Sequence, residues 1–246
     1  MIQVDALIIG AGPIGGYLAK KLCHAGHTVL MIEEHNQIGR PFQCAGLVNP
    51  GSMEKVGLES TALTRIWGAR IHGPGGTLVE IGSPERTRTW SVCRKLFDEA
   101  VVAQAISAGG SLMLNSTPKG TSISDEYVVT TISTDNTELT VKSKVVLGCD
   151  GAHSWVRRYH RMGRVRETMI GFQIDVTGYL HREGKLDMYT GQQIAPGFFA
   201  WAIPTGTTTR IGTFSRPDLL GGKSSEETLA ELLNHKPVSY THLRAH

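Results

Sequence analysis

The sequence lacks paired cysteines and long apolar runs. Its cysteines stand singly, with no Cys-x-x-Cys pair among Cys23, Cys44, Cys93 and Cys149. This spacing indicates neither a zinc site nor a disulfide framework, so we expect no metal and a reduced, cytoplasmic setting. No apolar run approaches the roughly 18 residues that a membrane-spanning helix needs. The first predicted strand begins almost at the amino terminus, so no signal peptide is expected.

Charge of one sign is also scarce. The 246 residues carry a formal net charge of +3, with 19% charged and 40% hydrophobic residues. These fractions are typical of a soluble globular protein, and so small a positive excess does not indicate a nucleic-acid partner. Basic residues gather only at Arg157, Arg158, Arg161, Arg164 and Arg166. A solvated surface, a phosphate neighbour and a contact for anionic lipid are all compatible with this group.

The amino terminus, in contrast, carries a strand, a glycine turn, a helix and a second strand. The hydrophobic pattern predicts these strands and this helix over residues 6–9, 28–32 and 14–24 respectively. Gly10, Gly12 and Gly15 follow the first strand in Gly-x-Gly-x-x-Gly spacing. The sequence therefore matches the start of a nucleotide-binding βαβ unit.

Each glycine of this turn has a physical role in binding a dinucleotide. Gly10 permits a tight turn, Gly12 lets the backbone approach a pyrophosphate, and Gly15 lets the helix pack closely on the strand. The helix N-terminus offers free N–H groups and a partial positive charge to the phosphates. Glu33, eighteen positions after Gly15, ends the second strand, where its carboxylate can accept hydrogen bonds from ribose hydroxyls. A plain glycine-rich turn does not account for Glu33, so we predict a dinucleotide site.

A second turn of the same kind comes later in the chain. Residues 144–147 form another apolar run of parallel-strand type, followed by an Asp-Gly turn at Asp150 and Gly151 and by a helix from Trp155. Such a turn again presents backbone donors and a carboxylate to a phosphate-bearing ligand. We predict that both turns converge on one bound adenine cofactor.

Three further residues lie in segments that the predicted fold brings near a ligand. Arg40, in the loop that leaves the second strand, is a candidate to face a phosphate or a flavin edge. Cys44 lies in the same glycine-flanked loop and is either a site residue or a small apolar filler. Arg94 directly precedes a helix predicted over residues 95–108, and either reaches a phosphate or is a surface charge flanking the helix.

The remaining pattern is that of β-structure. We expect a hairpin at residues 69–81, a meander of short strands between residues 111 and 141 on the nucleotide domain, and an antiparallel sheet from residue 171 onward. This sheet includes an aromatic strand at residues 198–204. Its aromatic face either covers an apolar ligand or is an ordinary core face.

At these residues the chain resembles the FAD-dependent geranylgeranyl reductases, including the archaeal digeranylgeranylglycerophospholipid reductases, within the flavoproteins of aromatic-hydroxylase type. The most specific feature is the loop at residues 39–47, which is similar to that family's Arg-Pro…Cys-Ala-Gly stretch beside the flavin. The glycine turn with Glu33, the helix start from Arg94 to Asp98, and the Asp-Gly turn resemble motifs of the wider superfamily.

A further stretch, residues 196–204, is similar to the family's substrate motif Pro-x-x-Tyr-x-Trp-x-Phe-Pro. Pro196, Trp201 and Pro204 match it, whereas Phe199 replaces the tyrosine and Ile203 replaces the phenylalanine. The hydroxyl of the tyrosine is therefore missing, but the apolar character of the motif is kept.

The resemblance implies an α/β fold and a set of site residues. The fold is a Rossmann-like FAD-binding domain of the aromatic-hydroxylase and glutathione-reductase type, with an antiparallel β-sheet substrate domain. Cys44 is the implied catalytic residue, near the flavin ring and the substrate, and Phe199 and Trp201 are implied to line a prenyl channel. The residues implied to bind FAD are Gly10, Gly12, Pro13, Gly15, Glu33, Glu34, Arg40, Cys44, Ala45, Arg94, Asp150 and Gly151.

The resemblance also implies where the domain boundaries lie. We expect an FAD-binding domain at residues 1–165, part of a β-sheet substrate domain at 166–236, and a non-native tail at 237–246. No Gly-Asp pair follows Gly151, although the family has a third flavin motif of that kind, so we expect the chain to be truncated at its C-terminus.

The function implied by the resemblance is the reduction of isoprenoid double bonds by FAD, on prenyl-lipid precursors of membranes and thus in lipid biosynthesis. A peripheral contact with the membrane would accompany such a substrate, and the electron donor, NAD(P)H or a reduced carrier, stays open. Two alternatives remain at this point: an FAD-dependent aromatic-ring monooxygenase, and a flavoprotein fragment without activity.

Overall fold

The computed structural model describes residues 1–135, 137–234 and 244–245. It contains two compact units, the first made of residues 1–43 and 94–164 and the second of residues 44–93 and the chain from residue 165 on. This division differs from the predicted domain boundaries, which assign residues 44–93 to the first domain. The reason is that a strand within residues 44–93 pairs with the sheet of the second unit.

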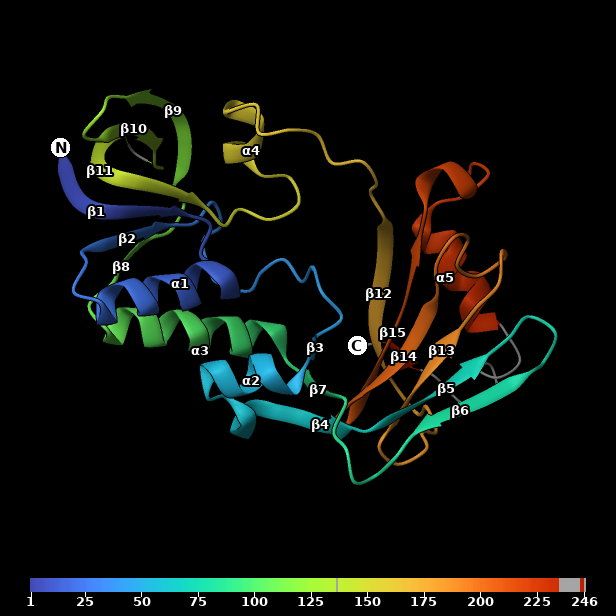
Figure 1. Cartoon of the computed structure of the whole chain (residues 1–246). Coiled ribbons are helices and arrows are strands. Elements are labelled where there is room, and N and C mark those ends of the chain that lie inside the picture. Colours follow the sequence, from blue (N-terminus) through green and yellow to red (C-terminus); the bar gives the residue numbers. More distant parts are fainter. Residues whose placement is uncertain (136, 235–243, 246) are drawn as a thin grey trace. The chain divides into compact units, whose positions relative to one another are not determined.

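The first unit is a sheet with helices on its faces (Figure 1). Its elements are β1 (Ile2–Ile9), α1 (Pro13–His24), β2 (Val29–Ile32), α3 (Arg94–Ser107), β8 (Ser111–Met113), β9 (Thr117–Ile123), β10 (Val128–Ser133), β11 (Glu138–Gly148) and α4 (Trp155–Tyr159). The strand order is β8-β2-β1-β11-β10-β9. The first four strands in this order are parallel, and β10 and β9 continue as an antiparallel meander, as the sequence predicts. One detail differs, because the strands expected at 139–141 and 144–147 are a single strand, β11.

Alternate residues of β1 face opposite sides of this sheet. Ala6 and Ile8 pack with Val102 and Ala105 of α3, and α1 and α3 lie side by side on this face (Figure 1). Leu7 and Ile9 face the other side. Both faces of this part of the strand are thus buried, which explains why residues 6–9 of β1 are an unbroken apolar run rather than an alternating one.

The register of the parallel strands brings the two predicted turns together. Ile9 pairs with both Ile32 of β2 and Gly148 of β11, so the carboxyl ends of the three strands lie at one edge. The N–H of Gly10 donates to the Ile32 carbonyl at 2.8 Å, and the N–H of Cys149 donates to the Ile9 carbonyl at 2.7 Å. Ligands of doubly wound sheets bind at such an edge.

The second unit contains a seven-stranded and a three-stranded sheet. The order is β16-β12-β15-β14-β13-β5-β6 in the larger sheet and β3-β7-β4 in the smaller one. The elements are β3 (Leu47–Val48), α2 (Pro50–Val56), a 3-10 helix (Glu59–Thr61), β4 (Ala62–Ile66), β5 (Gly68–His72), β6 (Leu78–Gly82), β7 (Thr89–Val92), β12 (Ile170–Thr177), β13 (Lys185–Tyr189), β14 (Ala200–Thr205), β15 (Thr208–Ser215), a second 3-10 helix (Pro217–Leu219), α5 (Ser225–Asn234) and β16 (Arg244–Ala245). The pairs are antiparallel as predicted, except that β13 and β5 run parallel.

The two faces of the larger sheet differ in character. Ala200 and Ala202 of β14 face α5 and pack in one core with Leu229 and Leu232. Residues at alternate positions of β14, beginning with Trp201, pack in a second cluster on the opposite face. This second cluster contains Trp201 of the predicted substrate motif, with Phe199 packed against it.

The predicted non-native tail falls mostly outside the described residues. Residues 237–243 and 246 are not described, whereas Arg244 and Ala245 form β16, which pairs with Val176 and Thr177 of β12. Among the helices of the described residues, none has the length and apolar character that crossing a membrane requires.

Candidate functional site

The glycine turn after β1 is built by close approach of backbone to backbone. Gly10 has a φ of +96°, and a Cβ at this position would lie 2.5 Å from the carbonyl oxygen of Cys149. A Cβ on Gly15 would lie 2.0 Å from the Gly10 carbonyl oxygen, so α1 can start here only because residue 15 is a glycine. A Cβ on Gly12 would meet nothing within 4 Å. Gly10 and Gly15 are thus required by packing, whereas Gly12 faces open space.

The N-terminus of α1 is open to an anion. Gly12 is the N-cap, no side chain caps the helix, and the first turn contains no acidic residue. Pro13 stands at the first helical position, where its missing N–H costs nothing. The remaining N–H groups of the first turn therefore lie beside the open space at Gly12, which is the arrangement that binds phosphate groups.

Glu33 has structural partners that the sequence did not reveal. Its Oε2 accepts a hydrogen bond from the N–H of Ala11 at 3.0 Å, and its Oε1 lies 2.6 Å from Nδ1 of His35. The backbone N–H of His35 also donates to Oε1, at 3.2 Å. A carboxylate offers about four acceptor positions, so Glu33 both holds the glycine turn and keeps room for a further donor. Its contact with a ribose stays a prediction.

The second turn lies against the first. Oδ2 of Asp150 accepts a hydrogen bond from the N–H of Val156 at the start of α4, at 3.1 Å. Its Oδ1 is buried and has no hydrogen-bond partner within the described residues. Gly151 follows with a φ of +70°. Burial and the Asp150 charge raise the pKa of the Cys149 thiol, which therefore stays protonated at neutral pH.

These observations test whether FAD fits the first unit. A buried carboxylate oxygen without a partner is costly, and a hydroxyl of a ligand would satisfy it. The unpaired Asp150 oxygen, the cradle formed by Gly10 and Gly15, and the uncapped helix at Gly12 all lie at one edge of one sheet. They supply a hydrogen-bond acceptor, a close backbone approach and an anion site, so the residues present fit a dinucleotide.

Arg94 is paired in a way that the sequence did not predict. Its Nε and Nη2 donate to the two carboxylate oxygens of Asp98, each at 2.9 Å. Burial raises the pKa of Asp98, and the guanidinium of Arg94 opposes this shift. The signal was present in the sequence, because Asp98 lies four residues after Arg94 and faces it on a helix. A contact between Arg94 and a phosphate stays a prediction.

Arg40 and Glu34 are surface residues. The guanidinium of Arg40 lies over the ring of Phe42, 4.5 Å from its centroid. The side chain of Glu34 is 68% exposed, and its carboxylate lies 3.9 Å from Nε2 of His35. Among the described residues, neither side chain has a hydrogen bond or ion pair with the glycine turn, so their roles at a cofactor stay predictions.

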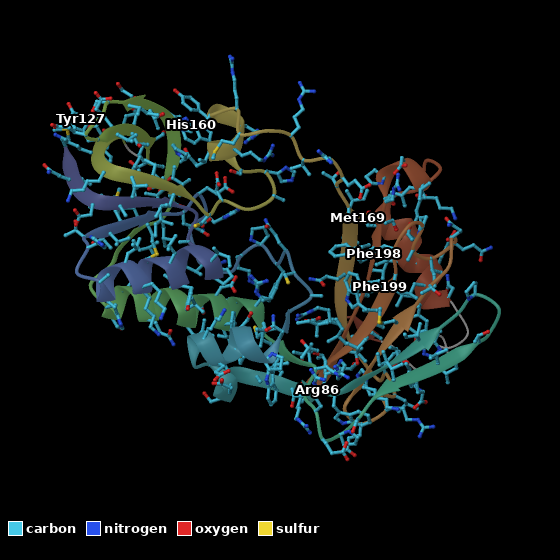
Figure 2. All side chains as sticks on the ribbon, viewed as in Figure 1. Arg86, Tyr127, His160, Met169, Phe198 and Phe199 are labelled. Atoms are coloured by element: carbon cyan, nitrogen blue, oxygen red, sulfur yellow. The ribbon has the colours of Figure 1, made fainter. Side chains whose placement is uncertain are left out.

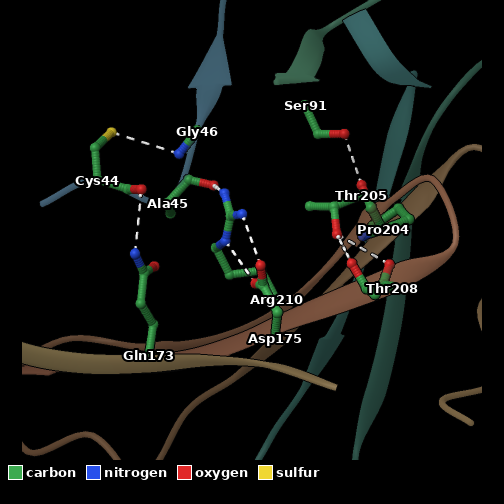
Figure 3. Close-up of polar contacts among 10 residues, drawn as sticks. All are labelled: Cys44, Ala45, Gly46, Ser91, Gln173, Asp175, Pro204, Thr205, Thr208 and Arg210. Atoms are coloured by element: carbon green, nitrogen blue, oxygen red, sulfur yellow. Dashed lines mark hydrogen bonds and ion pairs between the residues drawn. The ribbon is translucent and has the colours of Figure 1, made fainter. Parts of the chain in front are cut away.

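Residues 44–46, here called the Cys44 loop, belong to the second unit and are held by polar contacts (Figure 3). The N–H of Gly46 donates to Sγ of Cys44 at 3.5 Å. Nε2 of Gln173 donates to the Cys44 carbonyl at 3.2 Å, and Nη1 of Arg210 donates to the Ala45 carbonyl at 3.0 Å. Sequence reasoning missed Gln173 and Arg210, because only the register of β12 and β15 places them beside this loop.

Aromatic rings cover the same face of the sheet. Phe198 and Phe199 stack at 4.4 Å between ring centroids (Figure 2), and Trp201 meets the ring of Phe214 edge-on at 5.0 Å. Ala45 packs against the cluster that contains Trp201, so the Cys44 loop adjoins these rings. Of the predicted site residues, Ala45, Phe199 and Trp201 are thus in one cluster, and Cys44 directly precedes Ala45 in the chain.

Two glycines make room for these rings. A Cβ on Gly212 would lie 2.5 Å from Cζ2 of Trp201, and a Cβ on Gly171 would lie 2.1 Å from Cδ1 of Phe214. The rings therefore lie directly on the backbone of the sheet. Trp201 is only 4% exposed and its Nε1 has no hydrogen-bond partner among the described residues.

The opposite face of the sheet holds a buried ionic group that the sequence did not predict. Asp187 is fully buried and accepts a hydrogen bond from Nη2 of Arg70 at 2.8 Å. Nε2 of His72 lies 2.6 Å from its other oxygen. The hydroxyls of Tyr179 and Tyr189 lie 2.5 Å apart, and burial raises the pKa of both well above the usual range. Within the described residues, no group of three or more His, Cys, Asp or Glu side chains is arranged to hold a metal ion.

The chain is similar in sequence to curated reductases. Among curated proteins, the digeranylgeranylglycerophospholipid reductase of Methanosarcina acetivorans is 32% identical over 213 residues, which are 82% of this chain and 52% of that protein. Digeranylgeranylglycerophospholipid reductase 1 of Methanothermobacter thermautotrophicus is 28% identical, over 96% of this chain and 62% of that protein. The chain thus spans about half to three fifths of the length of these relatives.

Solved structures share the fold. A geranylgeranyl bacteriochlorophyll reductase-like protein from Thermoplasma acidophilum superposes with a TM-score of 0.87 at 23% identity, covering 100% of this chain and 65% of that one. The p-nitrophenol 4-monooxygenase of Pseudomonas putida superposes with a TM-score of 0.75 at 17% identity, over 99% and 67%. The predicted fold class and the predicted cofactor, FAD, are confirmed. Because the profile described as FAD binding domain matches residues 3–211, well over half of the sequence, the chain belongs to the FAD binding domain family.

Proposed function

We propose that the chain is an FAD-dependent oxidoreductase that reduces isoprenoid double bonds on prenyl-lipid precursors of membranes. The observation that carries this proposal is the Cys44 loop, which adjoins a sheet face of aromatic rings. The curated relatives named digeranylgeranylglycerophospholipid reductase support the substrate class. When bound and reduced, FAD supplies the hydride that one alkene carbon receives.

The first unit holds the adenine half of the cofactor in this proposal. The N-terminus of α1 and the backbone at Gly12 receive the pyrophosphate, and Oδ1 of Asp150 accepts a hydrogen bond from a hydroxyl of the cofactor. Gly151 keeps the backbone of the second turn close to it, and Arg94 supplies positive charge at the start of α3. These contacts bind and orient the cofactor and leave the chemistry to its ring.

The second unit binds the prenyl chain and supplies the proton. Phe199 is half-buried and offers an apolar surface for an isoprenoid chain, and the buried ring of Trp201 packs edge-on against it. Saturating a double bond needs a proton on the second alkene carbon, and we assign it to Sγ–H of Cys44. Gly46 fixes the position of this sulfur through its N–H. Phe199 stands where the related motif has a tyrosine, so a hydroxyl of that residue is not needed for the proposed chemistry.

The experiment is a single-turnover assay. The purified chain is loaded with FAD, reduced anaerobically with dithionite and mixed with a geranylgeranylated glycerolipid, and the lipid is analysed by mass spectrometry. We expect a gain of two hydrogens per double bond. Reduced flavin that persists without hydrogenated lipid contradicts the proposal. In a separate aerobic assay without dithionite, rapid oxygen consumption stimulated by an aromatic substrate indicates the monooxygenase alternative. Failure to retain FAD indicates the inactive fragment.

The role of Cys44 is tested separately with two variants. Cys44→Ala is expected to lower the rate of hydrogenation by about 100-fold or more, which is the range of a lost general acid. Cys93→Ala is the matched control, because Cys93 is a free, half-buried thiol of the same unit and has no role in the proposal. Full turnover by Cys44→Ala would remove Cys44 from the mechanism.

We also propose that residues 158–166 contact the anionic surface of the membrane that holds the substrate. Basic side chains alternate here with exposed apolar ones, and Tyr159, Met162 and Val165 are 46%, 69% and 48% exposed. Arginines attract anionic headgroups, while apolar side chains enter the interface. Such a segment would bring the active site to a lipid that stays in the membrane.

Vesicle sedimentation tests the membrane contact. The chain is expected to bind phosphatidylglycerol vesicles more strongly than phosphatidylcholine vesicles, and binding should weaken as salt rises. Replacing Arg161, Arg164 and Arg166 by glutamine should abolish this preference, whereas replacing the distant basic residue Lys55 by glutamine should not. Equal binding of the triple variant and the wild type would contradict the proposal.

A further inference from the structure

The backbone of the Cys44 loop is held by side chains from two neighbouring strands. Gln173 of β12 donates to the carbonyl of Cys44 itself, and Arg210 of β15 donates to the carbonyl of the next residue, Ala45. β12 and β15 pair in the register that sets Asp175 opposite Arg210. The two donors therefore come from the same face of adjacent strands (Figure 3).

Asp175 fixes the orientation of the Arg210 guanidinium. Its Nε and Nη2 donate to the two oxygens of Asp175, at 2.8 and 3.1 Å. The side chain of Arg210 is only 5% exposed. A bidentate pair of this kind orients the planar group, so Nη1 points at the Ala45 carbonyl.

The amide of Gln173 is placed by the aromatic face. Gly212 lies between Gln173 and Trp201 across the three strands, and a Cβ on Gly212 would lie 2.8 Å from Cβ of Gln173 and 2.7 Å from Cε2 of Trp201. The two side chains thus lie against each other over this glycine. Oε1 of Gln173 is buried and has no hydrogen-bond partner among the described residues, so its amide is oriented through Nε2 and the Cys44 carbonyl.

We infer that Gln173 and the Arg210–Asp175 pair are positioning residues, which fix the main chain at Cys44 and thereby hold its thiol at the aromatic face. This inference rests on the proposed function for its meaning, since a proton donor must stay within hydrogen-bond reach of the reacting carbon. The contacts themselves are properties of the second unit. Loss of either donor should free the loop without removing the thiol.

The test measures how fast iodoacetamide alkylates Cys44 in the whole chain, by mass spectrometry of the peptide that contains it. Gln173→Met keeps the length of the side chain and removes the donor. In this variant we expect iodoacetamide to alkylate Cys44 about fivefold faster than in the wild type at every pH. A fivefold ratio corresponds to about the net contribution of one hydrogen bond to stability. Alkylation of Cys93, measured in the same sample, is the internal control.

Gln173→Glu gives a signature that a general loss of packing would not give. Burial favours the protonated form of a carboxyl group, which at low pH can donate to the Cys44 carbonyl, whereas its ionised form repels that oxygen. The charged groups on the same face, Arg210 and Asp175, are fixed against each other. The ratio of the Cys44 alkylation rate in Gln173→Glu to the rate in the wild type should therefore rise from about one at pH 5.5 to about five or more at pH 8.5.

The second arm of the test removes the support of Arg210. Asp175→Asn is expected to speed Cys44 alkylation, because the guanidinium loses its charged partner. Asp218→Asn is the matched control, since Asp218 accepts a similar bidentate pair from the exposed Arg216. It should leave the Cys44 rate unchanged. In an active preparation, Gln173→Met should lower kcat while leaving KM for the lipid within twofold.

The outcomes separate this inference from the proposed function. The alkylation ratios need neither turnover nor flavin, so they can support the positioning role even if no lipid is reduced. Rates within twofold of the wild type for both Gln173 variants, with no pH dependence in Gln173→Glu, would overturn the inference. Equal acceleration at Cys93 would overturn it as well, because that result would report general unfolding.

Discussion

Alanine substitutions of Gly12 and Gly15, at the start of α1, should separate an effect on cofactor binding from an effect on stability. Gly12 has a φ of −71° and open space around its missing side chain, so alanine fits there in the folded chain. Replacing a glycine N-cap by alanine costs less than about 1 kcal/mol. The new methyl group would stand where the backbone is expected to approach the pyrophosphate. Gly12→Ala should therefore weaken FAD binding tenfold or more, with little change in stability.

Gly15→Ala should instead damage the fold. Its Cβ would lie 2.0 Å from the Gly10 carbonyl oxygen, so the turn must open by about 1.4 Å to reach ordinary contact distance. Overpacking of this kind costs about 1–3 kcal/mol. At about 2–4 °C per kcal/mol for a chain of this size, the apo protein should melt roughly 2–12 °C lower.

The assay uses apo protein for stability and flavin titration for affinity. Thermal unfolding is followed by circular dichroism without FAD, and the quenching of FAD fluorescence gives the dissociation constant. Gly51→Ala is the matched control, because a Cβ there meets only Asn49 Oδ1, at 3.6 Å, far from the turn in sequence. If Gly12→Ala bound FAD as tightly as the wild type, the pyrophosphate would not lie at the start of α1, and the fit described above would be wrong.

Three further results are expected in the second unit. Gly212→Ala should displace the ring of Trp201, changing its fluorescence spectrum and raising KM for a prenyl lipid, because the new Cβ would lie 2.5 Å from Cζ2. Asp187→Asn should lower the free energy of unfolding in urea by about 3–5 kcal/mol, because Arg70 loses its charged partner in a buried site. Burial lowers the pKa of His181 below its unfolded value of 6.5, so the unfolded chain binds the proton first as pH falls. Stability present above pH 6.5 should be lost as pH falls through 6.5 toward the folded pKa, and the urea midpoint of His181→Gln should depend less on pH.

The sequence alone predicts those parts of the site that depend on the backbone. The spacing of Gly10, Gly12 and Gly15 prescribes a turn geometry, and the structure contains that turn. The convergence of the two turns also follows from topology, since adjacent parallel strands end at one edge. The sequence could also have revealed the partner of Arg94, because Asp98 lies at the i+4 position of the same helix.

What the sequence does not predict depends on the pairing of distant strands. The contact of Gln173 with Cys44 joins residues 129 positions apart, and it requires the register of the larger sheet. β5 and β13 are also far apart in the sequence, and their parallel pairing places residues 44–93 in the second unit. Local patterns of hydrophobic and polar residues carry no information on such a register unless one face is distinctive.

Glycine has the same physical use in both units, although the partners differ. At Gly10 and Gly15 the missing Cβ admits a backbone carbonyl, which brings the start of α1 up to the end of β1 and leaves its N–H groups beside open space. At Gly171 and Gly212 the missing Cβ admits an aromatic ring, which lies on the sheet instead of standing away from it. Trp201 is nearly fully buried there, so the apolar surface that remains for an isoprenoid chain is that of the half-buried rings of Phe199 and Phe214. The glycines of β12 and β15 are therefore as much a part of the proposed prenyl site as Phe199 and Trp201, which the motif itself indicates.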